Sequence, residues 1–218
     1  MNGYSFFAPT KVLFGAGKLS ELGAQKLPGT KALIVTTGGN SVKRFGYLQR
    51  VEAELDRAGV AHELFDRIEP NPLRETVNAG GWMARTHGCD FVLALGGGSV
   101  MDGSKGICAV AANPHTDAEG NECPGDIWDF VNGGTALGLP IPNNPLPLVC
   151  VTTTAGTGSE ADAGGVISCE ENDEKLRLGD SRLFPGLSVV DPELMVSVPA
   201  RLTAYQGFDA LFHNVECY

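Results

Sequence analysis

Short apolar runs that end in glycine-rich turns are the main pattern along this chain. The clearest covers residues 91–95, Phe-Val-Leu-Ala-Leu, and three glycines follow it directly. Such a run is too short for an independent helix, whereas a strand buried on both faces of a sheet is apolar at every position. Residues 100–112 then show helical spacing and end at Asn113-Pro114, a typical helix stop. The pattern predicts a strand, a tight turn and a helix in succession.

The same alternation of strands and helices continues on both sides of this unit. It is typical of an α/β fold, here a Rossmann-like parallel sheet with flanking helices, in which ligands bind at the carboxyl ends of the strands. Besides the unit above, we predict strands at 31–36, 61–65, 147–152, 164–169 and 187–190, two short strands broken at Pro9 within 6–14, and helices at 18–26, 47–58 and 74–86.

Residues 113–147 form a long connection with little regular pattern. Five prolines lie between Pro124 and Pro147. Connections of this length are usually functional or disordered, and Trp128 and Phe130 supply apolar area that favours order. We interpret the segment as one wall of a binding cleft. A plain surface excursion is the alternative.

The final residues change character. Val198-Pro199 is expected to open a helix that Gly207 interrupts and that residues 208–216 continue. Asp209 and His213 are four residues apart, so their side chains share one helix face and can hold one divalent metal. A hydrogen bond on the helix surface is the alternative. Because the chain stops in mid-helix, we expect residues 1–196 to form one domain and 197–218 to begin a second, all-helical domain that is truncated here.

Charge and composition narrow the possible ligands. A formal net charge of −10 and a sequence pI of about 4.8 argue against binding to nucleic acid or to an anionic membrane surface. The sequence shows no signal peptide and no apolar window long enough to span a membrane, and its six scattered cysteines are typical of reduced thiols. These features predict a cytoplasmic protein. A phosphate ligand would have to be held by local backbone groups.

Two turns suit such a ligand. In the first, Gly97, Gly98 and Ser99 stand where a strand meets a helix, and glycines there allow close backbone approach to an anion at the helix N-terminus. In the second, Thr153 to Glu160 combine small hydroxyl residues with two glycines at the end of a predicted strand. Each could be an ordinary connection, but two at the carboxyl ends of parallel strands favour a binding site.

Five ordered motifs carry a resemblance to a known family. The motifs are Phe14-Gly15-Ala16-Gly17, Gly96-Gly97-Gly98-Ser99-Val100-Met101-Asp102, Thr153-Thr154-Ala155-Gly156-Thr157-Gly158-Ser159-Glu160, Asp191-Pro192-Glu193-Leu194 and Asp209-Ala210-Leu211-Phe212-His213. With these motifs in this order, the sequence resembles the iron-containing (group III) alcohol dehydrogenases, whose fold is dehydroquinate synthase-like, and within them the butanol dehydrogenase and aldehyde reductase branch.

The resemblance implies hydride transfer between NAD(P)H and a small aldehyde or primary alcohol, assisted by a divalent metal, Fe²⁺ or a substitute such as Zn²⁺. It implies a metal site of one aspartate and three histidines, of which Asp209 and His213 match the first two. The chain alone is therefore expected to be inactive. Together with the turns above, the resemblance places around the cofactor Gly38, Gly39, Ser41, Asn71, Gly97, Gly98, Ser99, Asp102, Thr153, Thr154 and Lys175.

The turn after the second strand bears on which cofactor is used. An acidic residue at that place hydrogen-bonds the adenosine 2′-hydroxyl and repels a 2′-phosphate. Here Thr37-Gly38-Gly39-Asn40-Ser41 follows, with no Asp or Glu before Glu52, while Lys43 and Arg44 stand nearby. We therefore expect NADP(H) to be preferred over NAD(H). A turn that merely permits both cofactors is the alternative.

Three hypotheses remain open. The first is an incomplete oxidoreductase, expected to form a homodimer or larger assembly because Leu202, Leu211, Phe212 and Val215 would leave an apolar surface exposed. The second is a cofactor-binding or structural domain without activity of its own. The third is related chemistry on the same fold, as in glycerol dehydrogenases and dehydroquinate synthases. The amino-acid sequence of residues 154–160 argues against this third hypothesis.

Overall fold

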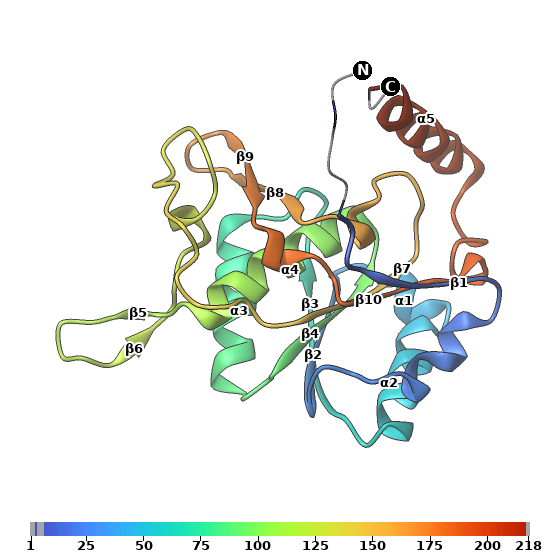
Figure 1. Ribbon diagram of the computed structural model, residues 1–218, viewed down its shortest axis with the longest axis horizontal. Coiled ribbons are helices and arrows are strands. Elements are labelled where there is room, and N and C mark those ends of the chain that lie inside the picture. The colour runs from blue at the N-terminus through green and yellow to red at the C-terminus, as the bar shows by residue number, and fades with distance from the viewer. Residues whose placement is uncertain (1–2, 4–6, 217–218) are drawn as a thin grey trace.

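Six parallel strands form the central sheet of the computed structural model, which describes residue 3 and residues 7–216 (Figure 1). In order across the sheet they are β1 (Lys11–Phe14), β10 (Leu187–Val190), β7 (Leu148–Thr152), β4 (Phe91–Gly96), β2 (Lys31–Thr37) and β3 (Ala61–Ile68). Every residue of β4 and β7 is buried, because helices or loops cover both faces of the sheet there. The α/β fold with a parallel sheet is confirmed.

Helices cover the two faces of the sheet and give the molecule two apolar cores. On one face lie α3 (Arg74–Thr86) and α4 (Gly98–Ala112), and on the other lie the 3₁₀ helix η1 (Lys18–Ala24), α1 (Ser41–Arg44) and α2 (Tyr47–Arg57) (Figure 1). The axes of α3 and α4 approach closely at Gly80, where a Cβ would stand 2.5 Å from Ile107 Cδ1. The sheet and these helices hold the carboxyl ends of the strands in place.

A separate antiparallel ribbon stands above that carboxyl edge. It pairs β8 (Gly164–Cys169) with β9 (Glu174–Gly179), and its inner face buries Ile167 and Leu178. No strand was predicted at β9, because residues 170–175 are mostly charged and form no apolar run. Its polar residues instead alternate with apolar ones, and Lys175 and Arg177 occupy the exposed face.

The long connection after α4 is ordered. It begins with a small hairpin of β5 (His115–Thr116) and β6 (Glu122–Cys123), which projects from the body in Figure 1, and continues through the 3₁₀ helix η2 (Ile127–Asp129). Trp128 is only 4% exposed and Phe130 7%, so the expected packing of both aromatic residues is confirmed.

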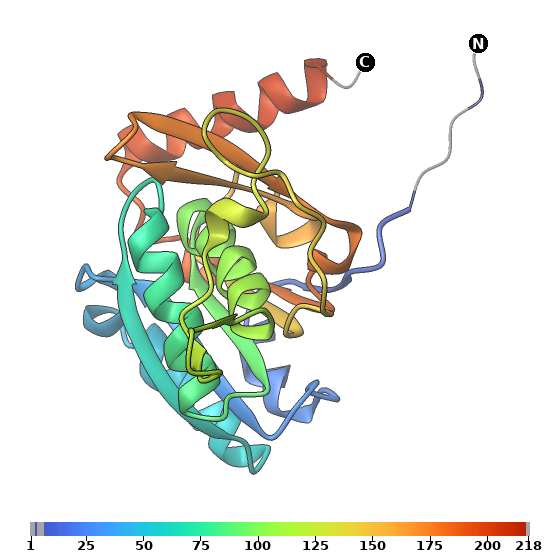
Figure 2. The same ribbon diagram turned by 90° about the vertical axis from the view of Figure 1, so that its left-hand side faces the viewer.

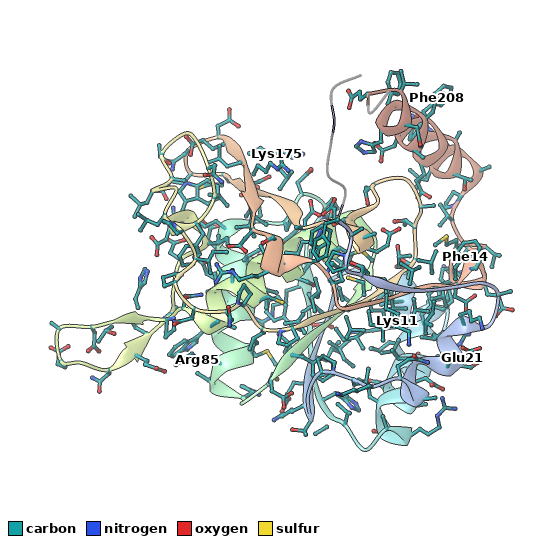
Figure 3. The ribbon with its side chains drawn as sticks, in the orientation of Figure 1. Lys11, Phe14, Glu21, Arg85, Lys175 and Phe208 are labelled. Carbon is teal, nitrogen blue, oxygen red and sulfur yellow. The ribbon has the colours of Figure 1, made fainter. Side chains whose placement is uncertain are left out.

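The last helix, α5 (Ala200–Glu216), differs from the prediction. It runs without a break through Gly207. One glycine inside a helix costs only about 1 kcal/mol relative to alanine, which does not break a long helix. None of its residues is buried. It stands on the same side of the sheet as the β8–β9 ribbon (Figure 2), and Phe208 lies on its outer side (Figure 3).

Smaller differences concern the ends of elements. Residues 18–26 form 3₁₀ turns over Lys18–Ala24 rather than an α-helix, and near the N-terminus only Lys11–Phe14 is a strand, while Phe6 lies outside the described residues. The five cysteines of the described part are free thiols. Among the described residues no helix has the length and apolar character needed to cross a membrane. Three further 3₁₀ helices are η3 (Ser159–Ala161), η4 (Ser181–Leu183) and η5 (Pro192–Leu194).

Candidate functional site

The turn between β4 and α4 has the geometry of an anion cradle. A Cβ at Gly97 would stand 2.5 Å from Thr154 Oγ1, and a Cβ at Gly98 would stand 2.8 Å from Thr157 Cγ2. Only glycine fits at these two positions without movement of the second turn. The N–H groups of Gly98 and Ser99 begin α4 and therefore have no carbonyl partner within the helix. The two predicted turns thus form one backbone-lined site that suits a pyrophosphate.

Three predicted residues from distant parts of the chain meet beside this cradle. The Asn71 N–H donates a hydrogen bond to Ser99 Oγ at 3.3 Å, and Lys175 Nζ donates to Asn71 Oδ1 at 2.8 Å. Asn71 has a φ of +59°, an uncommon conformation for a residue other than glycine. Figure 3 shows Lys175 on β9 above the carboxyl edge of the sheet. A hydroxyl, an amide and an ammonium group therefore line one side of the site.

Asp102, near the start of α4, was also predicted to lie near the cofactor, but both of its carboxylate oxygens accept hydrogen bonds from the protein itself. One oxygen accepts a hydrogen bond from Ser159 Oγ at 2.7 Å and the other from the Val166 N–H at 3.0 Å. Burial raises the pKa of Asp102, and these hydrogen bonds lower it only partly. The side chain joins α4 to the ribbon and to the Thr153–Ser159 turn.

Lys105 is a site residue that the sequence analysis missed. Its side chain is fully buried, and Nζ donates to Ser159 Oγ at 2.9 Å, Asp162 Oδ1 at 2.6 Å and Gly164 O at 2.6 Å. All three possible donors of the ammonium group are therefore used. The sequence does show one lysine within an otherwise largely apolar helix after the glycine turn, a pattern that could have indicated a buried, hydrogen-bonded ammonium group.

Gly38, Gly39 and Ser41 follow β2, as predicted, and an ion pair between α1 and β3 lies beside them. Lys43 Nζ lies 2.5 Å from Asp66 Oδ2, a carboxylate that β3 brings to the same edge. A cavity of about 350 Å³ lies between Ser41, Thr153 and Thr154 and the first turns of α5. The turn after β2 and the start of the Thr153–Ser159 turn thus border the same cavity.

Asp209 and His213 share one face of α5 above the Thr153–Ser159 turn. A Cβ at Gly156 would stand 3.1 Å from Asp209 Oδ2, and the Ala155 N–H donates to Gln206 Oε1 at 3.2 Å. His213 Nε2 lies 3.6 Å from Asp209 Oδ1, which is longer than a hydrogen bond. Carboxylate and imidazole donors suit Fe²⁺ or Zn²⁺, and both side chains are about half exposed. Within the described residues no group of three such donors is close enough to hold a metal.

A cleft of about 1010 Å³ opens beside the Thr153–Ser159 turn, and Asp102, Ser159 and His213 lie in its lining. Its walls come from α4, the Thr153–Ser159 turn, the β8–β9 ribbon, the long connection and α5. The connection contributes Asn132, so part of the segment predicted as a cleft wall does line it. The charged or ionisable residues at its surface are Asp102, Asp162, Arg177, Asp180 and His213.

Two of the resembling motifs act on the fold rather than on the site. The Asp191 carboxylate is fully buried and accepts hydrogen bonds from the N–H groups of Gly17 and Leu19, each at 3.1 Å, and of Glu193 at 3.0 Å. It therefore ties the end of β10 to the turn after β1.

Comparisons with known proteins agree with this geometry. The family model described as iron-containing alcohol dehydrogenase matches residues 9–192. The chain is 36% identical to the probable NADH-dependent butanol dehydrogenase 1 of Bacillus subtilis and 36% identical to the NADPH-dependent aldehyde reductase YqhD of Escherichia coli, in each case over 100% of this chain and 52% of the relative. The crystal structure of NADH-dependent butanol dehydrogenase A from Thermotoga maritima superposes with a TM-score of 0.87 at 29% identity, over 99% of this chain and 51% of that one.

The chain thus spans about half the length of the curated relatives it matches. The family match, in contrast, covers most of the chain, and the superposition extends over nearly all of it. The chain belongs to the iron-containing alcohol dehydrogenase family.

Proposed function

We propose that this chain supplies the cofactor-binding half, and part of the metal site, of an oxidoreductase that transfers hydride between NAD(P)H and a small aldehyde or primary alcohol. The observation that carries the proposal is that the Thr153–Ser159 turn packs against both the Gly97–Ser99 cradle and Asp209, while His213 lines the cleft beside that turn. Relatives named as butanol dehydrogenase and aldehyde reductase support the substrate class. A divalent cation held by Asp209, His213 and further donors would polarise the carbonyl group of an aldehyde.

The residues around the cradle would orient the cofactor, whose nicotinamide supplies the hydride. The backbone N–H groups of Gly98 and Ser99 suit the pyrophosphate, while Asn71 and Lys175 supply donors to the hydroxyl and phosphate oxygens near it. Thr153 and Thr154 close the opposite side. Asp102, whose oxygens are both engaged, would hold the shape of the cleft rather than contact the cofactor strongly.

We further propose that NADP(H) is preferred over NAD(H). The relatives include both NADH-dependent and NADPH-dependent enzymes, so the family leaves the preference open. The turn Gly38–Ser41 carries no acidic side chain of its own, and its glycines leave room for a 2′-phosphate, since a Cβ at Gly39 would meet only Thr37 Oγ1 at 3.5 Å.

Two metal ligands hold a cation weakly, because a divalent ion with few protein ligands stays largely hydrated. We therefore expect the 218-residue chain by itself not to turn over. In this proposal residues 197–218 begin a helical second domain, and the protein acts in the cytoplasm as a homodimer or larger assembly. A cofactor-binding or structural domain without activity is the second candidate, favoured because no group of three metal donors comes together among the described residues.

The test is NADPH oxidation in the presence of butanal. It is measured on the 218-residue chain and on a chimera extended with the second half of the Bacillus subtilis relative, with added Fe²⁺ and after chelation. Activity in the chimera alone, lost on chelation and in Asp209→Asn, is the expected result. Activity in neither protein would favour the second candidate, and tight stoichiometric iron binding by the 218-residue chain would overturn the expected inactivity.

A further inference from the structure

The strand β3 brings an acidic residue to the turn that the cofactor preference depends on. It continues to Ile68, beyond the expected end at residue 65, and Ile68 pairs in parallel register with Thr37 at the end of β2. The Gly38 N–H donates to Ile68 O at 3.3 Å, and a Cβ at Gly38 would stand 3.4 Å from Asp66 O. Asp66 is therefore a neighbour of the Gly38–Ser41 turn.

Asp66 is paired across this turn with Lys43 of α1. Lys43 Nζ donates to Asp66 Oδ2 at 2.5 Å. Both side chains remain open to solvent, with 40% of Lys43 and 37% of Asp66 exposed. The hydrogen bond from Lys43 lowers the pKa of Asp66, so the carboxylate is ionised at neutral pH. The pair can be reached by a ligand that lies on the turn.

The two partners have opposite preferences for the 2′ position of an adenosine ribose. A carboxylate accepts a hydrogen bond from a 2′-hydroxyl and repels a 2′-phosphate, as the acid after the second strand does in dinucleotide-binding folds. A lysine ammonium binds a phosphate as a point charge. While Lys43 is engaged by Asp66, part of its charge is neutralised and a phosphate must compete for it.

The other cations nearby have no such partner within the described residues. The Arg44 guanidinium lies 5.7 Å from the Phe45 ring centroid, and that of Arg67 lies 5.5 Å from the Phe65 ring centroid. They contribute positive potential without a carboxylate to neutralise them. These cations favour a phosphate on the turn, whereas the Asp66 carboxylate, paired with Lys43, opposes it.

We propose that Asp66 and Lys43 together read the 2′ position of the cofactor, with Asp66 limiting the preference for NADP(H) and favouring NAD(H). This inference rests on the proposed function, since it assumes that the adenosine ribose lies on the Gly38–Ser41 turn. It assigns to Asp66 the role that the residue after β2 does not fill here. Because Asp66 favours NAD(H) and Lys43 favours NADP(H), the same site can bind either cofactor.

The experiment separates the 2′-phosphate from the rest of the cofactor. The 218-residue chain is titrated with adenosine 2′,5′-bisphosphate and with adenosine 5′-monophosphate, and then with NADP⁺ and NAD⁺. The variants are Asp66→Asn and Lys43→Met. Asp56→Asn, which removes the same charge from a 72%-exposed side chain at the end of α2, is the matched control.

Asp66→Asn is expected to raise the affinity for the bisphosphate, relative to the monophosphate, by about 10-fold, as the loss of a charge repulsion and the release of Lys43 predict. Lys43→Met should lower that ratio by a similar factor, and Asp56→Asn should leave it unchanged. A ratio that Asp66→Asn does not change, or that Asp56→Asn changes equally, would overturn this inference alone. If no nucleotide binds to any variant, the proposed function fails as well.

Discussion

At the scale of single residues, buried charges shape the cleft. Lys105, Asp102 and Ser159 form one hydrogen-bonded group. All three hydrogens of the Lys105 ammonium group and both carboxylate oxygens of Asp102 have partners in it or next to it. Asp162, the fourth member, is about half exposed and holds Lys105 from the solvent side. Because a buried ammonium group is tolerated only with such partners, this group is sensitive to single substitutions.

We predict that Lys105→Met destabilises the protein by about 2 kcal/mol, because Ser159 Oγ and Gly164 O lose a charged donor in a buried place. The measurement is urea denaturation at neutral pH. Lys26→Met, at an exposed lysine, should change the free energy of unfolding by less than about 0.5 kcal/mol. Equal effects of the two substitutions would show that the Lys105 contacts do not stabilise the fold.

The role of a single residue could be predicted from the sequence where it depends on that residue and its neighbours along the chain. The glycines at 97 and 98 are required because a Cβ would meet Thr154 or Thr157. In contrast, Asp66 could not be assigned, since it reaches the cofactor turn only through the pairing of β3 with β2. The charged residues Asp66 and Arg67 interrupt the apolar pattern after Phe65, so the continuation of β3 to the buried Ile68 was not predicted.

At the scale of elements, the apolar strands were predictable because a strand covered on both faces has no polar position. The strand β9 and the hairpin β5–β6 were not predicted, since both lie outside the central sheet and polar residues interrupt every apolar run in them. The anchoring of the long connection also depends on tertiary contacts. Asp126 accepts hydrogen bonds from Arg74 Nε and Asn78 Nδ2 of α3, each at 2.9 Å.

The Asp126 anchor predicts an acid-dependent stability. Burial tends to raise the pKa of Asp126, but the hydrogen bonds from Arg74 and Asn78 outweigh it and the pKa lies below its ordinary value. A lowered pKa means that the stabilisation is complete above about pH 4 and is lost as the pH falls through the folded-state pKa. Asp126→Asn should therefore cost about 2 kcal/mol at pH 7 and progressively less below about pH 4.

Urea denaturation of Asp126→Asn and of the unmodified protein at a series of pH values measures this difference. Asp56→Asn, at an exposed carboxylate, serves as the control and should show no comparable trend. A cost of Asp126→Asn that is constant from neutral to acid pH would contradict the ionic nature of the anchor.

At the scale of the whole molecule, α5 presents a broad apolar surface. Exposed fractions of 62% for Phe208, 63% for Phe212 and 64% for Val215 leave large side chains in water. Patches of this kind promote association. We predict that the 218-residue chain self-associates with increasing concentration, and that Phe208→Glu with Phe212→Glu returns it to a monomer in light scattering.

The control for that measurement replaces Leu137 and Leu139 by Glu, because these side chains are also exposed but lie on the long connection. The pair should leave the association unchanged. A monodisperse monomer at every concentration, before any substitution, would show that the α5 surface does not drive self-association.

The central claim is that the Gly97–Ser99 turn binds a dinucleotide cofactor, and titration of the 218-residue chain with NADPH tests it most directly. Saturable binding of one NADPH per chain is predicted, and Gly98→Val should abolish it, because a Cβ at this position would stand 2.8 Å from Thr157 Cγ2 and block the turn. Gly207→Val, where a Cβ meets nothing within 4 Å, should bind as the unmodified chain does. Absence of saturable binding, or equal binding by Gly98→Val, would contradict the account.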